Sequence, residues 1–312
     1  MLGERILRLR PTNAMHQLGV TSRVPLFNLT HLLDGLAQHS LLWVTGIPHP
    51  ACLPGVLRAA SHLASPVGFA LKPLAADPDV LKEAKPAALF HAAVQAAEGI
   101  QRPVPFCLHA EAPAVDGLDG MAFDAVRSFV GTCVQVGYTS FGVDLRACDE
   151  DRAVEVARGL LGPVMELELG VSLRLAARGE DLSSRADSLD KQIRNLLRAE
   201  MTPRLFVIDA PAELGEEAWG MVADLQAGLP QGCGLAWPSL RSVDRAGTRG
   251  LCDSLLVALL AEDSLERRFP DAQSLADPAR LEALSYFEAL DMIEDLGGKQ
   301  ALHRWMQQVG QI

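Results

Sequence analysis

Short apolar runs, separated by longer segments with helical spacing, recur along most of this chain and constrain its fold more than any other feature. One run begins at Val104 and reaches His109, and another covers residues 139–145. Runs of this length without polar alternation are typical of parallel strands that are buried on both faces. Eight such runs alternate with helical segments, so the sequence predicts an α/β chain whose parallel sheet closes into a (β/α)8 TIM barrel.

The predicted order divides the chain into three parts. Residues 1–40 form an N-terminal extension with a helix that closes the barrel bottom, residues 41–262 form the barrel, and residues 263–312 form a C-terminal helical extension packed on it. The strands are expected at 41–46, 65–73, 104–109, 139–145, 163–170, 204–209, 233–238 and 252–260. The polar segment 171–184 is long for a connection and is interpreted as a rim loop or lid.

Composition excludes several kinds of partner. With 39 acidic and 28 basic residues among 312, the formal net charge is −11, which disfavours nucleic acid and anionic membranes as partners. No apolar stretch approaches the roughly 20 residues of a membrane helix, and the N-terminus lacks a secretory apolar core. Six cysteines lie mostly in apolar runs without CxxC pairing. Buried, reduced thiols and a cytoplasmic location are therefore expected.

Ionisable side chains follow the third and fourth apolar runs at the points where the strands should end. His109 and Glu111 close one run, and Asp144 and Arg146 close the next. The C-terminal strand ends of a parallel barrel form its functional rim. Lys72 ends the second run in the same way, so the sequence predicts a polar site at this rim.

Four segments resemble the class II (metal-dependent) fructose- and tagatose-bisphosphate aldolases. They are Val56-Leu-Arg-Ala-Ala-Ser-His-Leu-Ala-Ser-Pro-Val67, Val104-Pro-Phe-Cys-Leu-His-Ala-Glu111, Gly137-Tyr-Thr-Ser-Phe-Gly-Val-Asp144 and Met165-Glu-Leu-Glu-Leu-Gly170. The resemblance covers residues 30–240 in order and spacing. It implies the class II aldolase type of barrel, in which three histidines hold a zinc ion that polarises the ketose carbonyl and an aspartate moves the proton.

This chain departs from the family at the positions that carry the chemistry. Glu111 stands where the resemblance places the catalytic aspartate, and Ala112 stands at the first zinc histidine. No histidine occurs between residues 110 and 302, so the family's zinc site cannot be built. The glycine-rich phosphate loop after strand seven is replaced by Ala236-Trp-Pro-Ser239, which places bisphosphate recognition in doubt.

Two interpretations of the rim remain open. In the first, Glu111 and His109 are catalytic, and Asp144 and Glu168, which match acidic metal-associated positions of the family, hold a divalent Mg or Mn ion. In the second, no cofactor is bound, because Asp144 pairs with Arg146, an acidic residue pairs with Lys72, and His109 makes a buried hydrogen bond. In either case the candidate ligand-binding residues are Lys72, Arg146, Asp209 and Trp237.

We therefore expect a catalytically inactive or chemically atypical relative that acts as a ligand-binding or partner-binding subunit. The alternative is a divergent carbon–carbon lyase or isomerase of a sugar-phosphate-like substrate that uses a carboxylate-held divalent metal. A third hypothesis is a structural interaction protein assembled through Tyr286, Phe287 and Trp305. The expected partners are a small phosphorylated or polar metabolite and a protein, a second copy included, that docks on the C-terminal helices.

Overall fold

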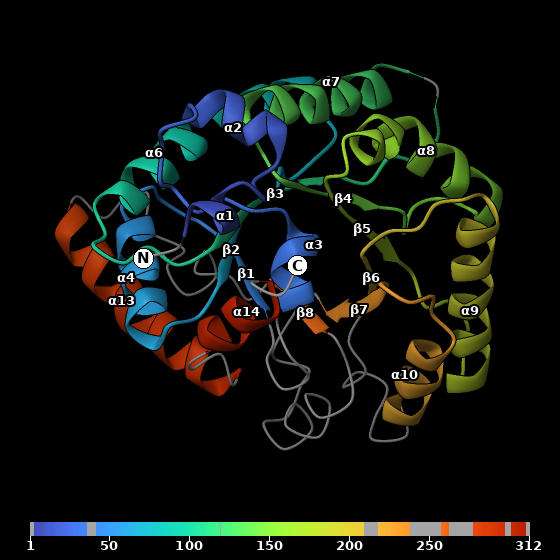
Figure 1. Ribbon diagram of the computed structural model, residues 1–312. Helices are drawn as coiled ribbons and strands as arrows, with labels where there is room; N and C mark the ends of the chain where they lie inside the picture. Colours follow the sequence, from blue (N-terminus) through green and yellow to red (C-terminus); the bar gives the residue numbers. More distant parts are fainter. Residues whose placement is uncertain are drawn as a thin grey trace.

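The computed structural model describes residues 3–35, 42–118, 120–208, 218–237, 257–261, 277–296 and 301–309. Within them, each strand is parallel to the next in chain order, and pairing of β8 with β1 closes the curled sheet (Figure 1). The connection between β7 and β8 lies outside the described residues, so the expected (β/α)8 alternation is described in part.

The strands agree with the predicted runs in all but one case. Their bounds are β1 Leu42–Gly46, β2 Val67–Leu71, β3 Phe106–Ala112, β4 Ser140–Asp144, β5 Gly170–Leu175, β6 Leu205–Ile208, β7 Gly234–Trp237 and β8 Val257–Ala261. The helices that cover the barrel are α4 Cys52–Leu63, α5 Pro78–Glu83, α6 Pro86–Glu98, α7 Met121–Val136, α8 Glu150–Glu166, α9 Leu182–Arg198, α10 Ala218–Ala227 and α13 Pro278–Asp295. At the ends of the chain lie α1 Glu4–Leu7, α2 Thr12–Leu18, α3 Leu29–Gly35 and α14 Ala301–Val309.

Alternation along the strands divides the apolar core into two clusters. Side chains such as Trp43, Phe106 and Phe206 belong to the large cluster between the sheet and its helices. Their neighbours in sequence, including Val44 and Cys107, belong to a smaller cluster inside the barrel and at its N-terminal end. Because successive residues of a strand point to opposite faces, the same runs supply both layers.

Helix α3 covers the N-terminal end of the barrel. Its residues Leu29, Leu32 and Leu33 belong to the interior cluster, and a Cβ on Gly170 would lie 2.7 Å from the Leu29 Cβ. Figure 1 shows α3 near the barrel axis. The helix therefore closes the barrel bottom, as its apolar spacing predicts.

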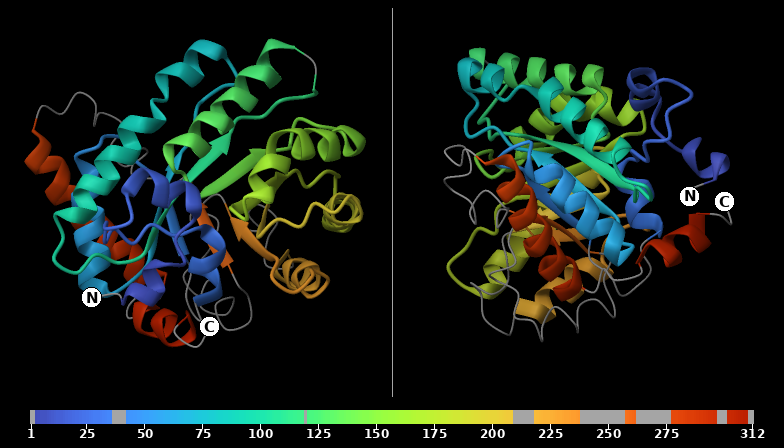
Figure 2. Two further views of the ribbon diagram at one scale, coloured as in Figure 1. Left: turned by 45° about the horizontal axis from the view of Figure 1, so that its top comes forward. Right: turned by 90° about the vertical axis from the view of Figure 1, so that its left-hand side faces the viewer.

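The C-terminal helices pack on two different parts of the barrel. Helix α13 lies along α4, and α14 lies against α3 at the end that also carries the N-terminal helices (Figure 2). Trp305 on α14 is fully buried, its Nε1 donates to the carbonyl oxygen of His31 at 2.8 Å, and its ring meets Phe27 edge-on. Trp305 thus holds the chain's own ends together, whereas Phe287 on α13 is 63% exposed.

The expected strand at 163–170 is wrong. The buried apolar face of α8 continues past Pro163 to Val164, and the helix runs to Glu166. Glu168 adopts a left-handed φ of 55° in the turn that follows, and β5 begins only at Gly170. Most of the segment interpreted as a rim loop is therefore β5 and the first turn of α9, which Asp181 caps.

No helix in the described part of the chain combines the length and the apolar character that a bilayer crossing requires.

Candidate functional site

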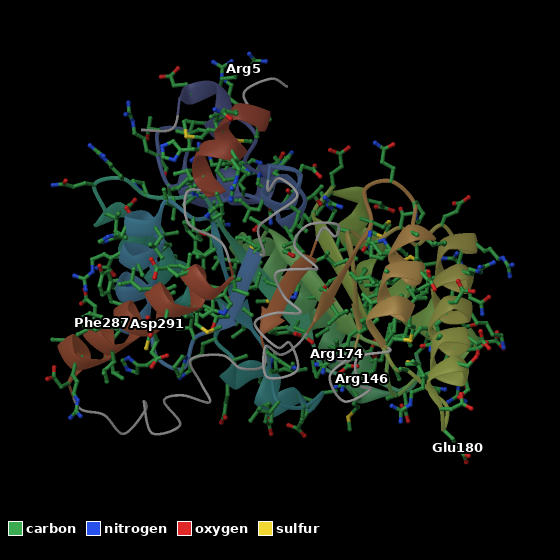
Figure 3. All side chains as sticks on the ribbon, turned by 90° about the horizontal axis from the view of Figure 1, so that it is seen from below. Arg5, Arg146, Arg174, Glu180, Phe287 and Asp291 are labelled. Carbon is green, nitrogen blue, oxygen red and sulfur yellow. The ribbon has the colours of Figure 1, made fainter. Side chains whose placement is uncertain are left out.

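The C-terminal ends of β2 to β5 bring five charged side chains to the barrel mouth. Lys72 follows β2, Glu111 lies in β3, Asp144 ends β4, Arg146 follows it, and Arg174 lies in β5 directly beside Asp144 in the register. Figure 3 shows Arg146 and Arg174 side by side, at the end of the barrel away from Arg5. We call these five residues the mouth cluster.

Glu111 lies between two cations of the mouth cluster. Its Oε1 is 3.7 Å from the Lys72 Nζ and 3.9 Å from the Arg174 NH1. The Glu111 side chain is 13% exposed, and that of Arg174 is 4% exposed. These ion pairs therefore lie where solvent screens charge only in part.

Asp144 is held by Arg146 from the same loop. The Arg146 Nε and NH2 donate to its two carboxylate oxygens at 3.0 and 2.7 Å, and the Arg146 backbone N–H donates at 3.1 Å. Burial alone would raise the pKa of Asp144, but the hydrogen bonds from Arg146 and the charge of Arg174 outweigh it and lower the pKa below its ordinary value. Asp144 is therefore a fixed anion, as the salt-bridge interpretation predicts.

His109 lies beneath the mouth cluster and is fully buried. Its Nδ1 is 2.9 Å from the Ser140 Oγ, and no described residue lies within hydrogen-bonding distance of its Nε2. A Cβ on Gly142 would come within 2.9 Å of that Nε2. Burial, with the nearby charge of Lys72, lowers the pKa of His109 to about 3, so the ring is neutral near pH 7.

The structure does not bring Glu168 to the mouth. Glu168 precedes β5, and its carbonyl oxygen accepts a hydrogen bond from Asn28 beside α3. Asp144 ends β4 and is in register with Arg174, four residues after the start of β5. At the rise of a strand, four residues separate Asp144 from the start of β5 by about 13 Å along the barrel. One ion cannot bind both carboxylates, and the described residues contain no group of three His, Cys, Asp or Glu side chains fit for a metal. The zinc site of the resembled family does not fit this chain.

The structure does not describe the side chains of two predicted ligand-binding residues. Asp209 lies outside the described residues, and Trp237 is the last residue of β7, beside Leu259 of β8, with only its backbone described. Their assignment stays a prediction.

Arg174 is the mouth residue that the sequence interpretation missed. It fell within the segment interpreted as a rim loop. The inward positions Gly170, Ser172 and Arg174 alternate with apolar Val171 and Leu173, and this period of two is the signal that indicates a strand.

Cys148 lies near the mouth but is not a reactive thiol. Its Sγ donates to the carbonyl oxygen of Val115 at 3.0 Å. Burial, followed by the charges of Asp149 and other nearby acids, raises the pKa of Cys148 to about 11. The thiol therefore stays protonated near pH 7.

No protein-family model and no curated protein sequence matches this chain. Solved structures, however, match the fold of this chain. The YdjI aldolase from Escherichia coli K12 aligns with a TM-score of 0.62 and 13% identity over 88% of this chain and 98% of its own. A protein from Coccidioides immitis assigned as a fructose-1,6-biphosphate aldolase aligns with a TM-score of 0.59 and 12% identity over 86% and 97%. The fold is therefore aldolase-like.

Proposed function

We propose that this chain is a class II aldolase-type (β/α)8 barrel that lacks the family's zinc site and acts as a ligand-binding subunit. The ligand is a small anionic metabolite, phosphorylated or carboxylated, that binds at the mouth cluster. The observation that carries the proposal is the charge of that cluster: Lys72, Arg146 and Arg174 contribute three cations, and Glu111 and Asp144 contribute two anions.

The local charge opposes the charge of the whole chain. The protein carries a formal net charge of −11, yet the described side chains of the mouth cluster sum to a positive charge. Guanidinium and ammonium groups recognise carboxylate and phosphate oxygens through charge-assisted hydrogen bonds. Lys72 and Arg146 are about one third exposed, so a ligand from solvent can reach them.

The alternative of a metal-dependent lyase loses its structural support, because Asp144 and Glu168 lie at opposite ends of the barrel. Association through the C-terminal helices rests on the exposed ring of Phe287 and is not the function that we favour.

Thermal unfolding and calorimetric titration test the proposal. The parent protein is titrated with fructose 1,6-bisphosphate, malonate and inorganic phosphate, with neutral fructose for comparison. A ligand at a hundred times its dissociation constant stabilises the folded state by about 2.7 kcal/mol, so an anion that binds raises the melting temperature. We expect Arg146→Gln to weaken this binding about tenfold.

Arg194→Gln is the matched control. Arg194 also pairs with an acidic neighbour, Asp190, but it lies exposed on α9, so its loss changes the net charge without touching the mouth. Equal weakening in both variants, or no response to any anion, contradicts the proposal.

A further inference from the structure

We propose that Arg174 is a built-in cation of the barrel mouth, which neutralises the carboxylates of β3 and β4 and thereby keeps divalent metal ions out. The inference goes beyond the proposed function and does not depend on the identity of a ligand. It concerns the divalent metal ions that the barrel mouth excludes.

Arg174 lies near two carboxylates that come from neighbouring strands. Its NH1 is 3.9 Å from Glu111 of β3, and its backbone is in register with Asp144 of β4. The charge of Arg174 contributes to the lowered pKa of Asp144, after the larger effects of burial and of Arg146. A single guanidinium therefore acts on both acids.

Burial distinguishes Arg174 from the other two cations of the mouth cluster. Its side chain is 4% exposed, whereas those of Lys72 and Arg146 are 36% and 37% exposed. Solvent screens the charges of Lys72 and Arg146, but it screens the charge of Arg174 much less. Arg174 is therefore the most deeply buried positive charge of the mouth cluster.

Two carboxylates on adjacent strands are the kind of ligand that Mg and Mn prefer. A guanidinium keeps its proton at every pH that the protein meets, so its charge cannot be withdrawn to admit a metal ion. A divalent ion placed beside it would be repelled by a cation that solvent screens only weakly. With Arg174 present, the mouth offers its acids no site for a metal.

Replacement of Arg174 removes the most buried of the cations near Glu111 and Asp144, so both carboxylates lose part of their compensating charge, which is destabilising. Two different changes should then restore stability. One is Glu111→Gln, which removes an excess negative charge. The other is a divalent ion, which replaces the missing positive charge.

The experiment measures thermal unfolding of the full chain with and without MnCl2. Four proteins are compared: the parent, Arg174→Met, Glu111→Gln and the double variant. We expect Arg174→Met to lower the melting temperature by several degrees and Glu111→Gln to restore at least half of that loss in the double variant. Manganese should raise the melting temperature of Arg174→Met and of no other protein in the set.

The inference is overturned if manganese stabilises the parent as strongly as Arg174→Met. It is also overturned if Arg174→Met responds neither to manganese nor to Glu111→Gln, because Arg174 would then act through packing alone. Should Arg174→Met fail to fold, recovery of a folded double variant supports the inference, and failure of both contradicts it. Arg194→Gln on α9 is the control for general effects of losing one arginine.

Discussion

His109 and Asp144 both have a lowered pKa, yet the consequences for their charge are opposite. Burial and Lys72 hold the ring of His109 neutral. Arg146 and Arg174 overcome the effect of burial on Asp144 and hold it ionised. A lowered pKa removes positive charge from a base and preserves negative charge on an acid. His109 therefore stays neutral and Asp144 stays ionised across the physiological pH range.

His109 should make the stability of the protein depend on pH. Its pKa is about 3 in the folded chain against an ordinary 6.5, so below pH 6.5 the unfolded chain binds the extra proton. The stabilisation is present above pH 6.5 and is lost as the pH falls towards 3, on the order of 1 kcal/mol per pH unit. We expect His109→Gln to flatten the free energy of unfolding, measured with urea, between pH 6.5 and 4.

The control for this prediction is His16→Gln on α2, where the side chain is exposed. If His109→Gln leaves the pH profile as steep as His16→Gln does, burial of His109 is not the cause of the dependence.

At the scale of secondary-structure elements, the contact between α4 and α13 depends on one glycine. A Cβ on Gly55 of α4 would overlap the carbonyl oxygen of Glu282 and the hydroxyl of Ser285, which itself donates to the carbonyl oxygen of Cys52. Beside this contact, Arg58 pairs with Glu282 at 2.8 Å. The missing side chain at Gly55 lets the two helices approach closely, and α13 is thereby fixed on the barrel.

Gly55→Ala should therefore destabilise the protein by about 1 to 3 kcal/mol, the usual range for an overpacked core. The measurement is urea unfolding at neutral pH. Gly131→Ala on α7 is the matched control, because no atom lies within 4 Å of a Cβ there. Removing a glycine from an open helical position should stabilise by about 0.5–1 kcal/mol. Equal effects of the two changes would contradict the role of Gly55.

At the scale of the whole molecule, the closed sheet buries thiols throughout the barrel. Cys52, Cys107, Cys133, Cys148 and Cys233 are all buried and unpaired with one another. Burial raises the pKa of each thiol, to about 11 for Cys52 and about 12 for Cys107. The prediction of buried thiols is confirmed for these five, and their reduced state stays a prediction. Cys252 lies outside the described residues.

A thiol-reactive dye should accordingly report unfolding of the entire barrel. In a Cys252→Ser variant, we expect almost no reaction in the native state and reaction of all five thiols in urea, over the same denaturant range as the loss of helical circular dichroism. Rapid native reaction of any thiol would show that its part of the barrel opens on its own.

The sequence by itself determined the strand runs, most helices and the end of the barrel at which the polar residues gather, because each depends on local periodicity. It also showed that the histidines of a zinc site are missing, since that needs only a residue count. The helix α3 at the barrel bottom and the pairing of Asp144 with Arg146 follow from residues close in sequence.

Only the tertiary structure decided which acids and cations from different strands meet. Pro163 and the apolar residues around it favoured a strand, but the buried face of α8 continues past them, so Glu168 lies at the far end of the barrel. Because β5 begins later than predicted, Arg174 lies within it and its side chain points inward. There it lies next to Glu111, which is 63 residues earlier in the chain. Contacts between strands depend on register, and a register is fixed by packing of the whole sheet rather than by any single segment.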